Sequence, residues 1–168
     1  MTISKLKTIN VIIVEADNII RDNLSEYFAS LGYSVEDIET EIELFELMQD
    51  KPAQIILLDY AEKSDATRIT INKLKAKYPT IVIMIMMSNP TIERILTLVD
   101  LGIQNILLKP ISLNECELHI ENASIMYSKN VSNELFNENK KIILELLSKK
   151  EISVPNCSTI EIVSTVDH

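Results

Sequence analysis

Residues 55–59 read IILLD, four apolar residues that end on an acidic one. Residues 9–14 read INVIIV and residues 81–86 read IVIMIM, so a short and largely apolar run occurs three times in the chain. Runs of this kind are typical of strands that are buried on both faces of a parallel sheet. The run at 55–59 therefore predicts a central strand whose carboxyl end carries Asp59.

Segments with the apolar spacing of amphipathic helices separate these runs. The first expected helix has Asn18 as its cap and ends at Gly32. The other four are expected at residues 41–48 and 67–77, from Pro90 to Gly102, and at residues 113–127. Two further short strands are expected around Val35 and at 105–108. Both glycines of the chain fall just past a helix, where a left-handed cap favours a residue without a Cβ. Five strands that alternate with five helices predict a doubly wound α/β fold with a five-stranded parallel sheet.

Charged and polar side chains follow the predicted strands at their carboxyl ends. They are Glu15 and Asp17 after the first strand, Asp59 after the third, Ser88 after the fourth and Lys109 after the fifth. In an open parallel sheet these ends meet at one rim and form the ligand site. Grouped carboxylates attract Mg²⁺, a carboxylate can attack phosphorus, and a lysine can pair with phosphate oxygens. The rim therefore predicts phosphoryl transfer to Asp59, although Asp17 and Ser88 are also compatible with a simple role as helix caps.

The runs VIIVEADNIIR (11–21), IILLD (55–59) and LGIQNILLKP (101–110) resemble the receiver domain family of two-component response regulators. The resemblance spans about residues 7 to 127 and implies a flavodoxin-like receiver fold. It makes Asp59 the phosphoacceptor and Lys109 the phosphate-sensing lysine, followed by a cis bond to Pro110. It also implies a Mg²⁺ site, whose expected ligands are Glu15, Asp17, Asp59 and the backbone carbonyl of Ala61.

The chain departs from the family pattern at three positions of the predicted site. Ala16 stands where the family usually has the second of two adjacent acidic residues. Met87 stands where the family has Ser or Thr, which leaves Ser88, one place later, as the possible hydroxyl. Ile106 stands where the family often has an aromatic residue. These departures concern the metal ligand and the conformational switch, and they motivate a second hypothesis.

The leading interpretation is a cytoplasmic response regulator receiver that is not an enzyme in its own right. A sensor histidine kinase or a phosphotransfer protein would phosphorylate Asp59 and so change the protein–protein contacts of the chain. The alternative is a pseudo-receiver that acts as a docking or dimerisation module without phosphorylation. A small phosphatase or hydrolase is a third class, but it needs a general acid near the acceptor, where the chain has only Ala61.

Composition excludes several other classes. The formal net charge of −9 argues against nucleic acid and anionic membranes as direct partners, because both reward clustered Lys and Arg. Cys116 and Cys157 are too few for a disulfide framework or a zinc cage and indicate reduced thiols in the cytoplasm. The longest apolar run, residues 81–87, is too short for a membrane helix, and the first residues lack the pattern of a signal peptide.

Residues 128–168 are expected to form a second part of the chain, after a receiver at 1–127. Apolar residues keep a rough helical spacing between residues 130 and 149; they are Val131, Leu135, Ile142, Ile143, Leu146 and Leu147. This segment either extends the fifth helix or forms a separate one. It either pairs with its copy in a homodimer or folds back on its own domain. Residues 151–168 alternate partly and are compatible with a terminal strand or with the start of a further output domain.

Overall fold

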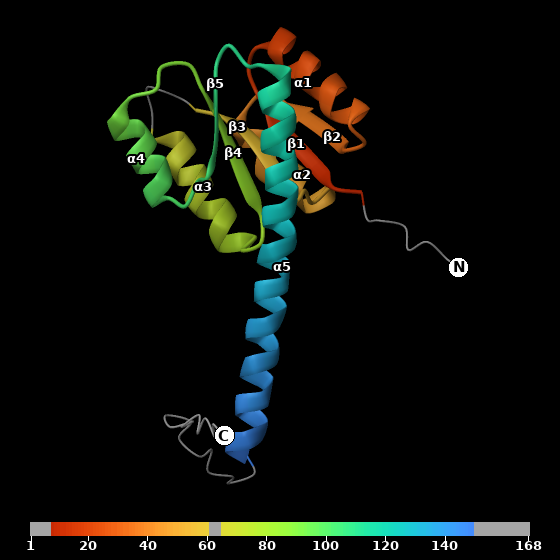
Figure 1. Ribbon diagram of the computed structural model, residues 1–168, viewed down its shortest axis with the longest axis vertical. Helices are drawn as coiled ribbons and strands as arrows, with labels where there is room; N and C mark the ends of the chain where they lie inside the picture. Colours follow the sequence, from red (N-terminus) through yellow and green to blue (C-terminus); the bar gives the residue numbers. More distant parts are fainter. Residues whose placement is uncertain (1–7, 61–64, 150–168) are drawn as a thin grey trace, which may run out of the picture. The chain divides into compact units, whose positions relative to one another are not determined.

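Five short strands form an all-parallel sheet in the order β2-β1-β3-β4-β5 (Figure 1). The computed structural model describes residues 8–60 and 65–149, and all statements of structure concern these residues. The strands are β1 (Asn10–Val14), β2 (Ser34–Ile38), β3 (Ile55–Asp59), β4 (Val82–Met87) and β5 (Asn105–Leu108). The register pairs Val14 with Leu58 and Asp59 with Met86, so the chain leaves β1, β3 and β4 at the same edge. The predicted parallel sheet is confirmed.

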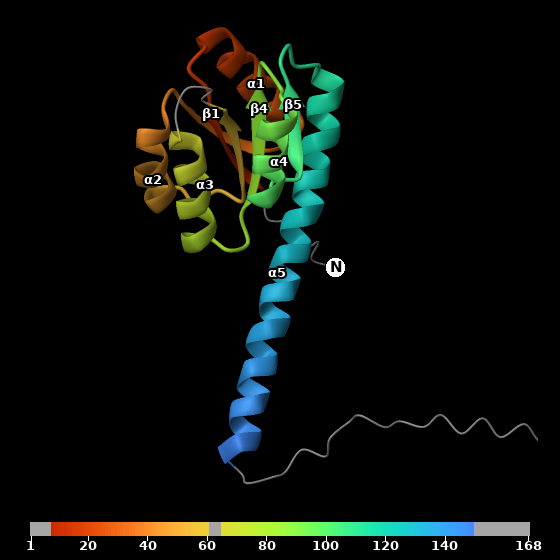
Figure 2. The same ribbon diagram turned by 90° about the vertical axis from the view of Figure 1, so that its left-hand side faces the viewer.

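Helices cover both faces of this sheet (Figures 1 and 2). They are α1 (Asn18–Ser30), α2 (Glu41–Asp50), α3 (Ala66–Lys77), α4 (Ile92–Asp100) and α5 (Leu113–Lys149). Helices α2, α3 and α4 pack on one face, and α1 and the first part of α5 pack on the other. The doubly wound α/β architecture expected from the alternation of elements is therefore present.

The core consists of two layers because neighbouring strand residues point to opposite faces of the sheet. Ile12, Ile56 and Leu58 lie in the layer that faces α2, α3 and α4. Val11, Ile13, Ile55 and Leu57 lie in the layer that faces α1 and α5, together with Phe28 and Ile120. The methionines of β4 are buried and belong to the core. A strand that is buried on both faces explains why each central run lacks the polar alternation of an exposed sheet.

The caps of two helices differ from the residues first expected. Asp17, for which a cap role was the alternative, is the N-cap of α1 in place of Asn18, and its carboxylate accepts hydrogen bonds from backbone N–H groups in the first turn of the helix. Thr91, not Ser88 or Pro90, caps α4. Several neighbouring residues can each supply a capping oxygen, so the sequence alone does not select among them. Gly32 and Gly102 do have the predicted left-handed backbone, with φ of 95° and 76°.

Helix α5 is continuous from Leu113 to Lys149, so the segment beyond Tyr127 extends the fifth helix rather than forming a separate one. Contacts between Cα atoms divide the chain after Ser132 into two compact units. Residues 151–168, for which a strand was predicted, lie outside the described residues. None of the helices at residues 8–60 and 65–149 is long and apolar enough to cross a membrane.

Candidate functional site

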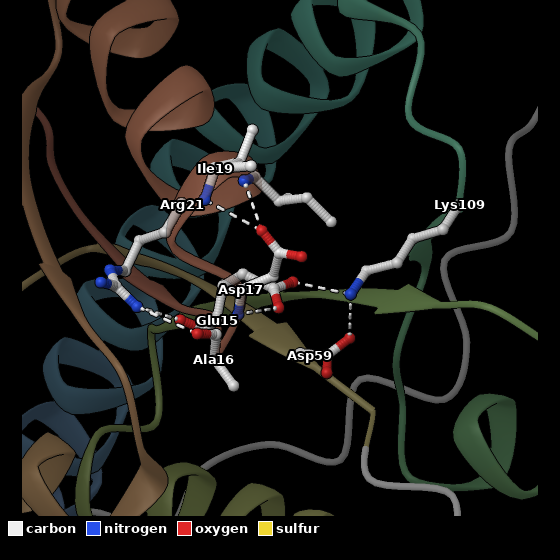
Figure 3. Close-up of polar contacts among 8 residues, drawn as sticks. Glu15, Ala16, Asp17, Ile19, Arg21, Asp59 and Lys109 are labelled. Carbon is white, nitrogen blue, oxygen red and sulfur yellow. Dashed lines mark hydrogen bonds and ion pairs between the residues drawn. The ribbon is translucent and has the colours of Figure 1, made fainter.

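The carboxyl ends of β1, β3 and β5 bring together three side chains that are far apart in the sequence (Figure 3). The Nζ atom of Lys109 donates a hydrogen bond to Oε2 of Glu15 at 2.7 Å. The same Nζ atom lies 2.8 Å from Oδ1 of Asp59. Lys109 therefore bridges the two carboxylates, and the predicted convergence of Glu15, Asp59 and Lys109 on one rim is present.

Burial differs sharply among the three groups. The Glu15 side chain is 3% exposed and that of Lys109 is 16% exposed, whereas 34% of the Asp59 side chain is open to solvent. A buried carboxylate is costly unless it is paired and hydrogen-bonded, and Lys109 supplies that partner to Glu15. Of the two carboxylates that Lys109 contacts, Asp59 is the one that a reagent in solution can reach.

The environment shifts the pKa of both ends of the bridge. Burial raises the pKa of Asp59, the hydrogen bond from Lys109 opposes that rise, and the charge of Glu15 adds to it. Burial by itself lowers the pKa of Lys109, but the hydrogen bonds to Asp59 and Glu15 outweigh it, so the pKa of Lys109 is raised. Lys109 is therefore a firmly held cation at neutral pH, next to a carboxylate that is more basic than a free one.

The loop after β1 is fixed by backbone contacts. The backbone N–H of Asp17 donates to Oε1 of Glu15 at 3.0 Å, so each oxygen of the Glu15 carboxylate has a partner. Arg21 donates from Nη1 to the carbonyl oxygens of Glu15 at 2.7 Å and Ala16 at 3.4 Å. Its Nε atom lies 3.4 Å from Oδ1 of Asp37. Sequence reasoning overlooked this positioning role of Arg21. The sequence did contain one signal for this role. Arg21 lies in the first turn of α1, and side chains of a helix tilt towards its N-terminus, where the loop after β1 lies.

Asp17 has a different role from the one expected for a metal ligand. Its Oδ1 atom accepts hydrogen bonds from the backbone N–H groups of Ile19 at 2.9 Å and Ile20 at 3.1 Å (Figure 3). The residue is exposed, and the carboxylate is engaged at the start of α1. Metal ligation by Asp17 stays a prediction that its capping contacts do not support.

The described residues do not form a complete site for Mg²⁺. This ion prefers oxygen ligands in a near-octahedral arrangement. Glu15 and Asp59 offer carboxylates, but Lys109 already contacts both, and Ala16 presents only a methyl group. Across residues 8–60 and 65–149 no group of three or more His, Cys, Asp or Glu side chains could hold a metal ion. The remaining predicted ligand, the carbonyl of Ala61, lies outside the described residues. Lys109 is therefore the positive charge that the described residues place at this rim.

The other predicted positions belong to β4 and β5 or follow them directly. Ser88 directly follows β4 and is exposed, whereas Met87 is 1% exposed and belongs to the core. Ile106 is half-buried in β5 and packs against the core layer of α2, α3 and α4. The bond between Lys109 and Pro110 is cis, as the sequence resemblance implied.

The fold and the rim define an α/β protein of the flavodoxin-like class, with an acidic site and a lysine at the carboxyl ends of its strands. The family model of the response regulator receiver domain matches residues 11–121. The chain belongs to this family.

Two similar curated proteins match this chain over part of their length. The TorCAD operon transcriptional regulatory protein TorR of Escherichia coli is 26% identical over 113 residues, which are 67% of this chain and 49% of TorR. A cyclic di-GMP phosphodiesterase of Thermotoga maritima is 26% identical over 140 residues, which are 83% of this chain and 36% of that protein. This chain thus spans half the length or less of these curated relatives.

Solved structures show the same fold. The signal receiver domain of an HD domain-containing protein from Pseudomonas fluorescens Pf-5 superposes with a TM-score of 0.65 at 15% identity, covering 73% of this chain and 99% of that domain. At this identity the likeness establishes the fold alone.

Proposed function

We propose that this chain is the receiver of a two-component phosphorelay, in which Asp59 accepts a phosphoryl group from a histidine kinase or a phosphotransfer protein. The observation that carries the proposal is the placement of Asp59, at the carboxyl end of β3, partly open to solvent and 2.8 Å from the ammonium of Lys109. Membership of the receiver family supports it. The proposed role is regulatory and cytoplasmic, exerted through contacts with other proteins.

The chemistry follows from the charges at the rim. An oxygen of Asp59 attacks the phosphorus, the bond from phosphorus to the nitrogen of the donor's phosphohistidine breaks, and an acyl phosphate forms on Asp59. The charge of the carboxylate is then replaced by that of the phosphoryl oxygens. Lys109 stabilises this charge as it develops, because its ammonium is already positioned there. Glu15 keeps Lys109 in place throughout, since its hydrogen bond to the ammonium does not depend on Asp59.

A cleft beside the rim supports the docking of a protein donor. It has a volume of about 650 Å³ and lies between α1 and the connection from β5 to α5. Its lining includes the apolar side chains of Ile20, Leu24, Ile111 and Leu113 and the polar side chains of Asn23, Glu26 and Lys109. A pocket that combines apolar side chains with a cation suits an apolar protein surface that carries a phosphoryl group. We infer that the donor binds here and presents its phosphohistidine to Asp59.

Phosphorylation by a small-molecule donor tests the proposal without knowledge of the kinase. The full chain is incubated with acetyl phosphate, in Mg²⁺ and separately in EDTA, and the intact mass is followed. We expect one phosphoryl adduct on the wild type and none on Asp59→Asn. Lys109→Met should form the adduct at least about tenfold more slowly, because the positioned cation is lost. An adduct that persists in Asp59→Asn would place the acceptor elsewhere.

The pseudo-receiver is the second candidate, and two observations favour it. Ala16 provides no carboxylate, and the fully buried Met87 occupies the position where the family has a hydroxyl. Absence of any adduct under both conditions, with the fold intact by circular dichroism, would support docking without phosphorylation and exclude the leading proposal.

A further inference from the structure

The C-terminal part of α5 presents large apolar side chains to solvent. Five of them, here called the α5 stripe, are each more than half exposed: Leu135 (55%), Phe136 (68%), Ile142 (54%), Ile143 (56%) and Leu146 (55%). Nothing in the described part of the chain covers them. Contiguous exposed apolar surface of this kind marks an interaction site, because apolar side chains gain free energy when they leave water.

The spacing of the stripe matches a coiled coil. Leu135, Asn139, Ile142 and Leu146 follow one another at intervals of four, three and four residues. At roughly 100° per residue these positions form one line along the helix, with Phe136 and Ile143 beside it. This is the pattern of a and d positions, with Asn139 at an a position between apolar neighbours.

We propose that the α5 stripe pairs with the same stripe of a second copy of this chain, in a parallel and in-register coiled coil. The inference is independent of phosphorylation, since it involves neither Asp59 nor Lys109. The C-terminal part of α5 would then serve homodimerisation and would not fold back on its own domain.

Asn139 favours this occupant and this orientation. In a parallel, in-register pair the two Asn139 side chains face each other and can hydrogen-bond across the seam. In an antiparallel pair an a position faces a d position, so Asn139 would lie against Leu135 or Ile142. An amide buried there without a partner costs free energy, which disfavours the antiparallel arrangement.

The charges beside the stripe favour the same arrangement. Glu138 and Glu145 occupy g positions of this pattern, and the e positions on the other flank are Phe136 and Ile143. In a parallel pair each g position faces an e position of the partner, so neither glutamate faces a like charge. In an antiparallel pair like flanks meet, which places glutamates against glutamates. Such exposed charges contribute little affinity, but they discriminate between orientations.

Sedimentation of the full chain over a range of concentrations tests the association. We expect a reversible dimer for the wild type. Ile142→Asp should raise the dissociation constant at least about 100-fold, because each dimer would bury two new carboxylates.

Leu144→Asp is the matched control. Leu144 is 53% exposed, like Ile142 at 54%, but it lies outside the stripe. Its substitution should leave the dimer intact, and both variants should keep the circular dichroism of the wild type. A wild type that stays monomeric at the highest concentration, or equal weakening by both substitutions, would overturn the proposal.

Cross-linking tests the orientation. Leu146→Cys is made in a Cys157→Ser background, and the remaining Cys116 is buried with its pKa raised to about 11. In a parallel, in-register dimer the two introduced thiols face each other, and we expect a disulfide between copies at least about tenfold faster than for Lys141→Cys, on the opposite side of the helix. Equal rates for the two variants would exclude the parallel seam.

Discussion

Lys109 holds two carboxylates with a single ammonium, and the two differ in what surrounds them. Glu15 is enclosed and has a hydrogen-bond partner on each oxygen, which suits a group that keeps its charge and position. Asp59 is open on one side and has a raised pKa. Similar groups thus acquire different roles from their burial, one as a fixed counter-ion and the other as the proposed nucleophile.

The raised pKa of Asp59 gives a prediction for stability. The native state binds the proton of Asp59 more tightly than the unfolded chain does. The contribution of Asp59 to the free energy of unfolding is therefore full below its unfolded pKa and is lost as the pH rises through its native pKa. At pH 7 the wild type has lost this contribution, whereas the neutral side chain of Asp59→Asn carries no charge to bury. We expect the substitution to stabilise the protein, and by about 1 kcal/mol or less, because water screens a partly exposed group.

Urea unfolding at neutral pH and in mild acid measures this effect. The advantage of Asp59→Asn should shrink on acidification, since the wild-type carboxyl group then binds its proton. An advantage that grows towards acid would contradict the direction assigned to the pKa.

Ala16 gives a prediction about metal affinity. Ala16 is exposed and follows Glu15 directly, so Ala16→Asp adds a carboxylate beside the rim without disturbing the core. We expect the variant to bind Mg²⁺ at least about tenfold more tightly than the wild type, because a further oxygen ligand joins Glu15 and Asp59. Titration followed by amide chemical shifts measures the affinity, and Ala16→Asn is the neutral control. Equal affinities for the wild type and Ala16→Asp would show that Ala16 does not limit metal binding.

At the scale of single residues, the sequence predicted which side chains reach the rim but not what each one does there. Glu15, Asp59 and Lys109 were identifiable because a parallel sheet gathers its strand ends at one edge. The capping role of Asp17 was ambiguous, because a carboxylate just before a helix has both the rim and the backbone N–H groups within reach. Arg21 was overlooked because two of its partners are backbone carbonyls, whose positions depend on the fold of the loop, and its place in the first turn of α1 was the one signal in the sequence.

At the scale of elements, Asp17 connects the start of α1 to the rim, since its side chain caps the helix and its backbone N–H donates to Glu15. Asp17→Ala should lower the free energy of unfolding by about 1 kcal/mol, through loss of the hydrogen bonds to Ile19 and Ile20. Asn18→Ala is the matched control and should have little effect, since Asp17 is the observed cap. Denaturant unfolding of both variants measures the difference. A larger loss for Asn18→Ala would reverse the assignment of the cap.

The elements themselves were predictable because each carries its own periodicity. The runs of β1, β3 and β4 are too apolar to lie anywhere but between two layers of helix. The end of α5 was not predictable in this way, since an amphipathic pattern does not show whether a helix continues or breaks at a particular residue. The structure has one helix across that point.

At the scale of the whole molecule, the division after Ser132 separates the proposed acceptor from the proposed dimer seam. A chain that ends at Ser132 keeps all the core residues of both layers and the hydrogen bond from Asn130 to the carbonyl of Thr80. We expect it to unfold cooperatively within a few degrees of the full chain in dilute solution, because the removed helix contributes no buried core residue. Calorimetry measures the midpoint.

The same truncated chain should sediment as a monomer and should still accept phosphoryl groups from acetyl phosphate. A large drop in the unfolding midpoint would show that the receiver depends on the removed residues. If the truncated chain still forms a dimer, the contact between the two copies must lie outside the α5 stripe.

The partial exposure of Asp59 also bears on how long an acyl phosphate on this residue would last. An acyl phosphate formed there lies in an opening that admits a donor and therefore admits water as well. If Asp59 is phosphorylated as proposed, we therefore expect the acyl phosphate to be lost by hydrolysis without a second protein, so the exposure of Asp59 would limit how long the phosphorylated state lasts.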